Sequence, residues 1–313
     1  MLSYDQIKDK PSVLLSFTGL TQDEFEELLI AFAFAWHKSE QMRQKKRVRQ
    51  RQIGGGRKPK LRTIADRLLF ILFYLKTYPL QEVQAFLFNM SQGQANEWIH
   101  RLAKVLKIAL ADSDYLPERE GERLLEILRE NETLSFVQDG CERRRQRPKD
   151  NDLQKEYYSG KKKAHTMKNH LVVHSESRRV CYLSKTVPGK KHDKKLADES
   201  DIQYPPLSLL EQDTGFQGFD PAGIVVLQPT KKPKGKDLTH SEKFINRCVS
   251  SGRIVVEHVI AGVKRCRIVK DILRNWKNDF DDLIVELACG LHNLRVTKRS
   301  PIESINLIDF YFQ

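Results

Sequence analysis

The sequence predicts an α+β protein with an all-helical N-terminal domain, residues 1–130, and a mixed α/β domain, residues 131–313. Apolar residues recur at helical spacing through most of the first part, whereas short β-type runs separated by turn residues begin at Leu134. The chain has 313 residues, of which 40% are hydrophobic. This size and composition suffice for two domains or for one large domain with a substantial core.

The charge of the chain indicates a polyanionic partner. The formal net charge is +13, and nucleic acid is the simplest partner for such an excess. Five scattered Cys residues without a CxxC pattern indicate reduced thiols in a cytosol. The longest purely apolar run, residues 68–75, is far shorter than the ~20 residues that span a bilayer. We therefore expect a cytoplasmic protein without a membrane partner.

Several helices are predicted in the N-terminal part. Thr21 and Glu24 form a capping-box pattern at the start of the first clear apolar stripe, and Ser91 is a suitable N-cap for a later helix. Beyond the first stripe, helices are predicted over residues 64–76, 80–88, 92–106 and 112–129. The three-residue turn 89–91 between two of them gives the pattern of a helix-turn-helix.

Two features of this region favour contact with DNA. The segment 43–62 carries ten Lys or Arg around three Gly residues. A charge run is often only a solvated face, but its single sign and its flexible arm favour phosphate contact through Arg57, Lys58 and Lys60. The second helix of the pair would present polar side chains outward, and Gln and Asn can read adenine edges. The predicted DNA-contacting residues of this helix are Gln92, Gln94, Asn96 and Arg101.

The C-terminal part alternates strands and helices. Predicted strands cover residues 134–137, 169–174, 180–187, 207–212 and 224–227, and predicted helices begin at His192 and cover residues 237–249, 253–264 and 280–296. The first three strands would form an antiparallel meander. The basic stretch Lys161, Lys162, Lys163 and His165 would contact phosphate beside the first acid described below, or would form a solvated hairpin edge.

Three acidic residues of this part occur in the order Asp, Asp, Glu, two at strand ends and one on a helix. Asp139 follows the first strand, Asp213 ends a later one, and Glu257 lies on the helix 253–264. Arg253 and Lys264 share the face of that helix with Glu257 because they are four and seven residues away. Each feature has an ordinary alternative: Asp before Gly or Thr-Gly is a favourable turn, and Glu257 could form simple ion pairs on a solvated helix.

Taken together, the three acids point to metal-dependent chemistry. Carboxylates brought to ~4 Å repel by about 4 kcal/mol per pair at an effective dielectric near 20, and divalent cations offset that repulsion. Mg²⁺ prefers oxygen ligands, and two ions ~3.5–4 Å apart stabilise both the attacking and the leaving oxygen in phosphoryl transfer. A basic chain with such a site suits a nuclease or a strand-transfer enzyme.

The sequence resembles the bacterial insertion-sequence transposases of the acid-triad (DDE) superfamily, in the branch related to PIF/Harbinger elements. The resemblance covers nearly the whole chain, and four motifs carry it. They are Asp139-Gly140-Cys141-Glu142 with the basic stretch after it, Gly189 with His192-Asp193, Asp213 to Gly218, and Arg253, Glu257 and Lys264 at their spacing. Two positions depart from the family pattern, since Ser250 replaces a Tyr and Cys141 replaces a Thr found in many relatives.

The resemblance implies a ribonuclease-H-like catalytic core and a metal-dependent reaction on double-stranded DNA. Asp139, Asp213 and Glu257 would hold two Mg²⁺ ions, for which Mn²⁺ could substitute, and Arg253 and Lys264 would contact phosphate. The N-terminal helices would bind the terminal inverted repeats, and the freed 3′-hydroxyls would be joined to target DNA. A homo-oligomer on DNA, in the bacterial cytoplasm at the nucleoid, is expected.

Two alternatives remain at this point. A domesticated, non-catalytic DNA-binding relative would keep the fold and the charge, but the intact acids argue against it because binding needs none of them. A plain metal-dependent nuclease without end recognition would differ in DNA specificity, on which the sequence is silent.

Overall fold

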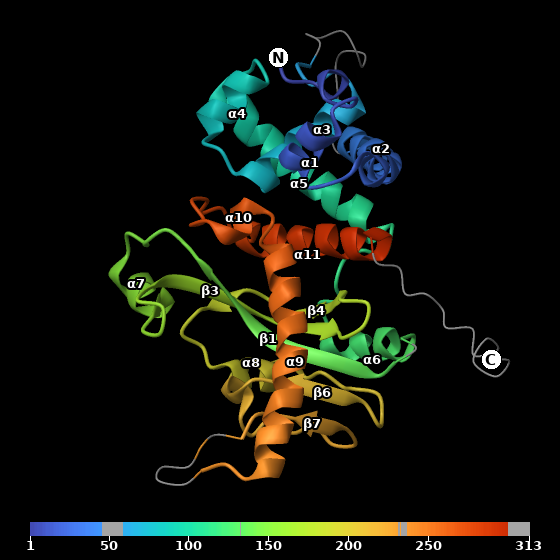
Figure 1. The fold of residues 1–313 in the computed structure, drawn as a ribbon. Coiled ribbons are helices and arrows are strands. Elements are labelled where there is room, and N and C mark those ends of the chain that lie inside the picture. Colours follow the sequence, from blue (N-terminus) through green and yellow to red (C-terminus); the bar gives the residue numbers. More distant parts are fainter. Residues whose placement is uncertain (46–58, 132, 231, 233–236, 300–313) are drawn as a thin grey trace, which may run out of the picture.

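The computed structural model describes residues 1–45, 59–131, 133–230, 232 and 237–299. Helices of the N-terminal part form the upper layer, α11 (Phe280–Arg299) crosses the middle, and a sheet lies below it (Figure 1). The long helix α9 (His240–Val263) runs across one face of that sheet. The predicted α+β layout is confirmed. None of the described helices combines the length and apolar character needed to cross a bilayer.

The N-terminal helices form where their caps and stripes predict them. The elements are η1 (Tyr4–Gln6), α1 (Pro11–Thr18), α2 (Gln22–Lys45), α3 (Ile64–Thr77), α4 (Gln81–Leu87) and α5 (Gln92–Ala111). The backbone N–H of Thr21 donates to Glu24 at 2.8 Å, and the N–H of Ser91 donates to Gln94 at 3.1 Å. Both contacts belong to capping boxes, so the predicted N-caps are confirmed.

The predicted helix 112–129 is wrong in its first half. Helix α6 (Gly121–Arg129) begins nine residues later than predicted, and Asp114 adopts a left-handed conformation with φ 54°. Pro117 lacks an N–H, and a residue before proline avoids helical geometry. The backbone N–H of Glu118 donates instead to Cys181 O at 2.8 Å, so this segment runs beside the sheet.

A seven-stranded sheet forms the lower part of the molecule. Its strands are β1 (Ser135–Arg144), β2 (Tyr158–Ser159), β3 (Ala164–His174), β4 (Val180–Leu183), β5 (Val187–Pro188), β6 (Leu209–Gln212) and β7 (Val225–Leu227). The order is β2-β3-β1-β6-β7, with β4 and β5 also paired to β3. The β1–β3–β4 pairs are antiparallel, as the meander predicted, while β1–β6 and β6–β7 are parallel. This arrangement agrees with the expected ribonuclease-H-like layout.

Two boundaries in this part differ from the predictions. Strand β1 continues to Arg144, so Asp139 lies inside the strand rather than after it. The predicted helices 237–249 and 253–264 are one continuous helix, α9, because Val249, Val256 and Val263 recur every seven residues and keep one face buried. The other elements are α7 (Asn151–Tyr157), α8 (Asp193–Ser200), η2 (Thr214–Phe216) and α10 (Arg267–Lys270).

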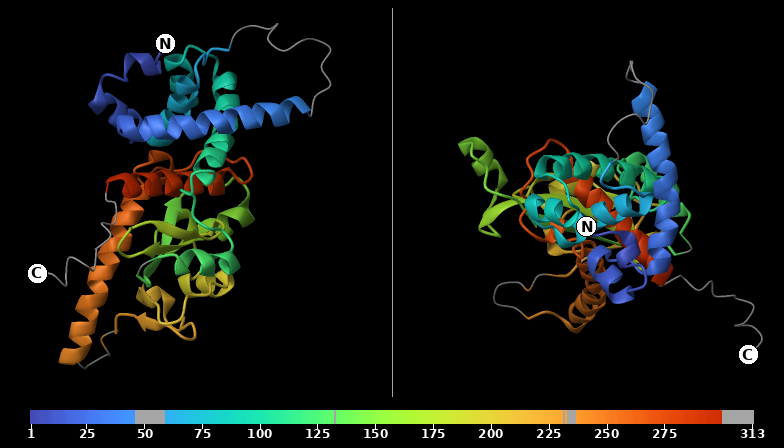
Figure 2. Two further views of the ribbon diagram at one scale, coloured as in Figure 1. Left: turned by 90° about the vertical axis from the view of Figure 1, so that its right-hand side faces the viewer. Right: turned by 90° about the horizontal axis from the view of Figure 1, so that it is seen from above.

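The larger hydrophobic core is shared by the N-terminal helices and the sheet. It joins residues such as Phe70 and Leu106 to Leu287 of α11, Val259 of α9 and Val137 of β1. Figure 2 shows α11 lying between α2 and α5 on one side and the sheet on the other. A smaller core covers the opposite sheet face under α6. The larger core is continuous across residue 130, and the division at residues 130 and 131 stays a prediction.

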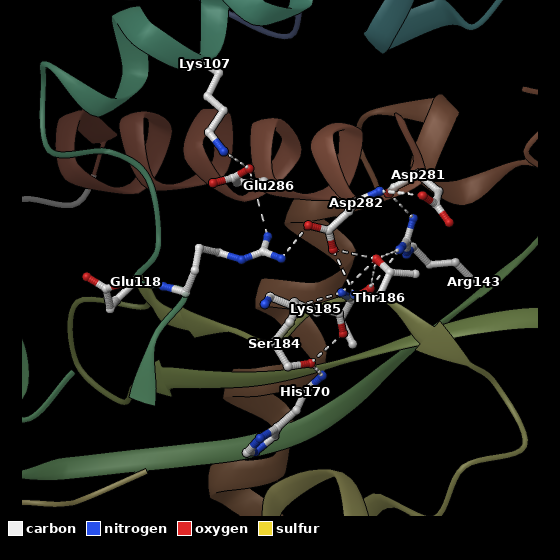
Figure 3. A network of polar contacts seen from close by, with 12 residues as sticks. Lys107, Glu118, Arg143, His170, Ser184, Lys185, Thr186, Asp281, Asp282 and Glu286 are labelled. Atoms are coloured by element: carbon white, nitrogen blue, oxygen red, sulfur yellow. Dashed lines mark hydrogen bonds and ion pairs between the residues drawn. The ribbon is translucent and has the colours of Figure 1, made fainter. Parts of the chain in front are cut away.

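A polar network holds α11 on both sides (Figure 3). From above, Lys107 of α5 forms an ion pair with Glu286 at 2.8 Å. From the connecting segment, Arg119 contacts Asp282 at 2.5 Å. The carboxylate of Asp282 also accepts hydrogen bonds from the backbone N–H and the hydroxyl of Thr186, each at 2.8 Å. Helix α11 is therefore fixed to the helical region and to the sheet by the same few charges.

Candidate active site

Two of the predicted acids lie on the same face of neighbouring parallel strands. Gln138 of β1 is the direct partner of Gln212 of β6, and the two side chains join on the smaller-core face at 2.5 Å. Successive residues of a strand point to opposite faces. Asp139 is the next residue of β1, and Asp213 directly follows β6 with an extended backbone, so both project toward the larger core and α9. Both are partly buried.

The backbone orients each of these carboxylates. The N–H of Gly140 donates to Asp139 Oδ1, and the N–H of Thr214 donates to Asp213 Oδ1, both at 2.7 Å. Asp213 is also the N-cap of η2, and its own carbonyl accepts a hydrogen bond from Gln228 Nε2 at 2.8 Å. In each acid one carboxylate oxygen is thus turned toward the following peptide.

Helix α9 brings the third acid to the same face. Its buried residues Val256 and Val259 pack in the larger core with Val137 and Cys141 of β1. Glu257 is exposed on this helix. Lys264, at the C-cap of α9, places Nζ 3.5 Å from the carbonyl of Glu142, beside β1. The backbone of Arg253 lies in α9, and its side chain is outside the described residues.

A further carboxylate on this face was not predicted. Glu211 pairs with Val137 across the parallel strands and stands two residues before Asp213, so it projects from the same face. Burial raises the pKa of Glu211. The two-residue period of a strand is the signal that would have identified it.

The donor chemistry of the three acids fits a hard divalent cation. Carboxylate oxygens are the ligands that Mg²⁺ and similar ions prefer, and a cation offsets their mutual repulsion. Within the described part of the chain, no three His, Cys, Asp or Glu side chains gather closely enough to hold a metal ion. The sheet places Asp139 and Asp213 at adjacent positions, and Glu257 lies on the helix that crosses the same face.

A groove of about 1430 Å³ runs along the predicted helix-turn-helix. The structure brings four of the predicted DNA-contacting residues to its walls: Lys60, Gln94, Asn96 and Arg101. Gln92 and Gln94 are exposed. The groove follows α4 and α5, so the predicted contacts share one surface. Arg57 and Lys58 lie outside the described residues.

Some of these side chains also have partners within the protein. Gln92 and Asn96 both donate hydrogen bonds to Gln81 of α4, at 2.6 and 3.1 Å. Arg101 forms an ion pair with Glu40 and lies 4.1 Å above the ring of Trp36. These contacts fix α5 against α4 and α2, which the sequence pattern did not reveal.

The basic stretch before β3 is not beside Asp139. Lys161, Lys162 and Lys163 are exposed between β2 and β3, and His165 pairs with Tyr158. Asp139 pairs with Leu171, six residues further along β3, which corresponds to about 20 Å at ~3.3 Å per residue. The predicted position was wrong because β1 and β3 are longer than their apolar runs.

Comparison with known families identifies a DNA endonuclease that carries its own helix-turn-helix region. A family model described as DDE superfamily endonuclease matches residues 138–293, and one described as helix-turn-helix of DDE superfamily endonuclease matches residues 59–112. The chain is 30% identical over 245 residues to the probable transposase for insertion sequence element IS702 of Microchaete diplosiphon, covering 78% of this chain and 85% of that relative. No solved structure matches the chain.

The chain belongs to the insertion-sequence transposases of the DDE superfamily. The segments matched by the two family models coincide with α3–α5 and with the region from β1 to α11. The resemblance to the DDE transposases is therefore confirmed. The protein is a DNA-binding enzyme, and the non-catalytic alternative is not supported. Endonucleases of this superfamily use divalent metal ions.

Proposed function

We propose that this transposase binds the terminal inverted repeats of its own element, cuts the element ends and joins the freed 3′-hydroxyls to target DNA. The observation that carries the proposal is that Asp139 in β1 and Asp213 at the end of the neighbouring parallel strand β6 lie on one face, and that Glu257 is on the helix that crosses this face. A helix-turn-helix with a groove along it supports recognition of DNA by the same chain.

Asp139, Asp213 and Glu257 would hold two Mg²⁺ ions, with Mn²⁺ as a substitute. When bound, the ions would polarise the scissile phosphate and the attacking oxygen. The protein's own contribution is orientation, because the N–H groups of Gly140 and Thr214 turn one oxygen of each strand acid. Lys264, beside β1, would neutralise phosphate charge, and Arg253 on the same helix face would do likewise.

DNA recognition would combine phosphate and base contacts. Gln94, exposed at the start of α5, would reach base edges, and Gln92, Asn96 and Arg101 would contribute from the same surface. Phosphate contacts would come from Arg57, Lys58, Lys60, Lys161, Lys162, Lys163 and His165. Pairing two element ends requires a homo-oligomer on DNA, acting in the bacterial cytoplasm at the nucleoid.

The test uses labelled duplexes that end in the element's inverted repeat, incubated with Mg²⁺ or Mn²⁺. The wild type should cut at the repeat end, whereas Glu257→Gln should bind with unchanged affinity and lose cleavage by a factor of about 10² or more. Glu126→Gln removes an exposed carboxylate on α6 and should cut like the wild type. Tight binding without cleavage by any of the three proteins would contradict the proposal.

A further inference from the structure

Another carboxylate lies behind the two strand acids, on the opposite face of the sheet. Asp193 is the first residue of α8. A Cβ built on Gly140 would lie 2.5 Å from Asp193 Oδ1, and one built on Gly215 would lie 2.8 Å from Asp193 Oδ2. Gly140 directly follows Asp139, and Gly215 is two residues after Asp213. The carboxylate of Asp193 therefore occupies a space that only glycine at both positions leaves free.

Lys168 of β3 fixes this carboxylate. Its Nζ lies 2.9 Å from Asp193 Oδ1 and donates a hydrogen bond to the carbonyl of Lys191 at 2.9 Å. The side chains of Lys168 and Asp193 are 10% and 22% exposed, so water and salt screen the pair less than a surface pair. Asp193 Oδ1 receives no well-aligned hydrogen bond from a described residue, which leaves the ion pair to offset its burial.

The ion pair between Lys168 and Asp193 thus links β3 and α8 to the backbone of β1. Lys168 belongs to β3, where it pairs with Glu142 of β1, and its side chain also passes 3.4 Å from the position of a Cβ on Gly140. Asp193 lies directly against Gly140 and Gly215, which follow the two acids in the chain. A shift of Asp193 would move the backbone of β1 relative to the β6–η2 junction, and with it Asp139 relative to Asp213.

We propose that Asp193 and Lys168 are positioning residues of the active site, which set the relative placement of Asp139 and Asp213 from behind the sheet. The inference rests on the proposed metal-dependent cleavage. The competing explanation is that Asp193 is only a favourable negative charge at the N-terminus of α8. The two explanations differ in whether loss of Asp193 affects cleavage and metal binding in a folded, DNA-binding protein.

The experiment compares Asp193→Asn and Lys168→Met with Asp198→Asn in the full-length protein. Asp198 is a matched control because it lies on the same helix, in an exposed ion pair with Lys194 at 2.6 Å. Asp193→Asn and Lys168→Met should bind repeat DNA within about two-fold of wild type and cut it about 10- to 100-fold more slowly, the range expected when reacting groups are displaced by a fraction of an ångström to 1 Å. Asp198→Asn should cut at the wild-type rate.

A second readout does not depend on cleavage. Mn²⁺ or Mg²⁺ added without DNA should raise the melting temperature of the wild type and of Asp198→Asn, because a ligand that binds the folded state stabilises it. That increase should be smaller in Asp193→Asn and Lys168→Met at equal metal concentration. Lys168→Arg, which keeps the positive charge, should recover most of the cleavage lost in Lys168→Met.

If Asp193→Asn cleaves DNA and responds to metal ions like the wild type, the inference is overturned. Asp193 is then only a favourable negative charge at the N-terminus of α8. If Asp193→Asn does not fold, the Lys168 variants decide: equal loss in Lys168→Arg and Lys168→Met would overturn it. Failure of the proposed function looks different, because the wild type itself would then cut no repeat DNA with either metal ion.

Discussion

Two buried histidines link the stability of the fold to pH. His170 of β3 contacts Gln138 Oε1 through Nε2 at 2.9 Å, and burial lowers its pKa to about 3. His292 of α11 contacts the carbonyl of Arg178 at 2.9 Å, and burial lowers its pKa to about 4. In the unfolded chain both have a pKa near 6.5. Below this value the unfolded state binds protons that the folded state does not, so acid destabilises the fold.

We expect the free energy of unfolding to fall by about 2 kcal/mol for each of these histidines between pH 7 and pH 5. Urea denaturation at a series of pH values measures this slope. His170→Gln and His292→Gln should each have a shallower slope, whereas His37→Gln, at an exposed position, should keep the wild-type slope. Identical slopes in all four proteins would contradict the assignment of these buried neutral rings.

At the residue scale the sequence identified the chemistry but not its surroundings. Asp139, Asp213 and Glu257 could be selected because their order and spacing match a family pattern. Glu211 was accessible only through the two-residue period of the strand that leads to Asp213. Asp193 belonged to a family motif, but its position behind the two acids depends on which helix packs against the sheet. Likewise, the buried guanidinium of Arg143, which donates to Asn169 Oδ1 at 2.7 Å, has no signature in the sequence.

At the element scale, two of the cations on α5, Arg101 and Lys104, have different surroundings. Arg101 forms an ion pair with Glu40 and stacks on Trp36, and its side chain is 26% exposed. Lys104, three residues later, is exposed. Contacts between a guanidinium and an aromatic ring add to the ion pair, so Arg101 contributes to the packing of α5 on α2.

Arg101→Ala should therefore lower the free energy of unfolding by about 1–2 kcal/mol, and Lys104→Ala should change it by less than about 0.5 kcal/mol. Urea denaturation measures both values, and a DNA-binding titration on the same proteins separates stability from affinity. Wild-type stability with weakened DNA binding in Arg101→Ala would show that Arg101 serves DNA alone.

Secondary structure was predictable where local signals act alone. The capping boxes at Thr21 and Ser91 gave helix starts, and the apolar runs gave the central strands. The predicted boundaries of helices and strands were wrong where pairing with another segment of the chain determines them. The segment around Pro117 pairs with β4, and β1 extends to Arg144 because β3 provides a hydrogen-bonding partner along its length.

At the scale of the whole molecule, one core joins the DNA-binding helices to the catalytic sheet. Leu287 of α11 is fully buried in it. Leu287→Ala should lower the free energy of unfolding by about 2–5 kcal/mol, and calorimetry should show one transition that moves as a whole. Hydrogen exchange should report weaker protection in both α3 and β1. Two separate transitions, with only one shifted, would contradict a shared core.

The net charge of +13 predicts a strong dependence of DNA affinity on salt. If six to ten phosphates are contacted, affinity should fall by about 10³–10⁵ between about 50 and 200 mM salt. A fluorescence titration with repeat DNA and with unrelated DNA measures this fall and the specificity together. A flat dependence would count against phosphate contact as the main source of affinity.

The position of α11 limits how this transposase could be redesigned. Lys107 and Arg119, from the helical region and its connection, bind Glu286 and Asp282 on one helix, and Asp282 in turn binds Thr186 beside the sheet. A chimera that exchanged the helix-turn-helix region, residues 59–112, for a relative's would replace Lys107 and remove the closest cation of Glu286. Retargeting to other element ends therefore requires that the contact between α5 and Glu286 of α11 be rebuilt together with the recognition helices.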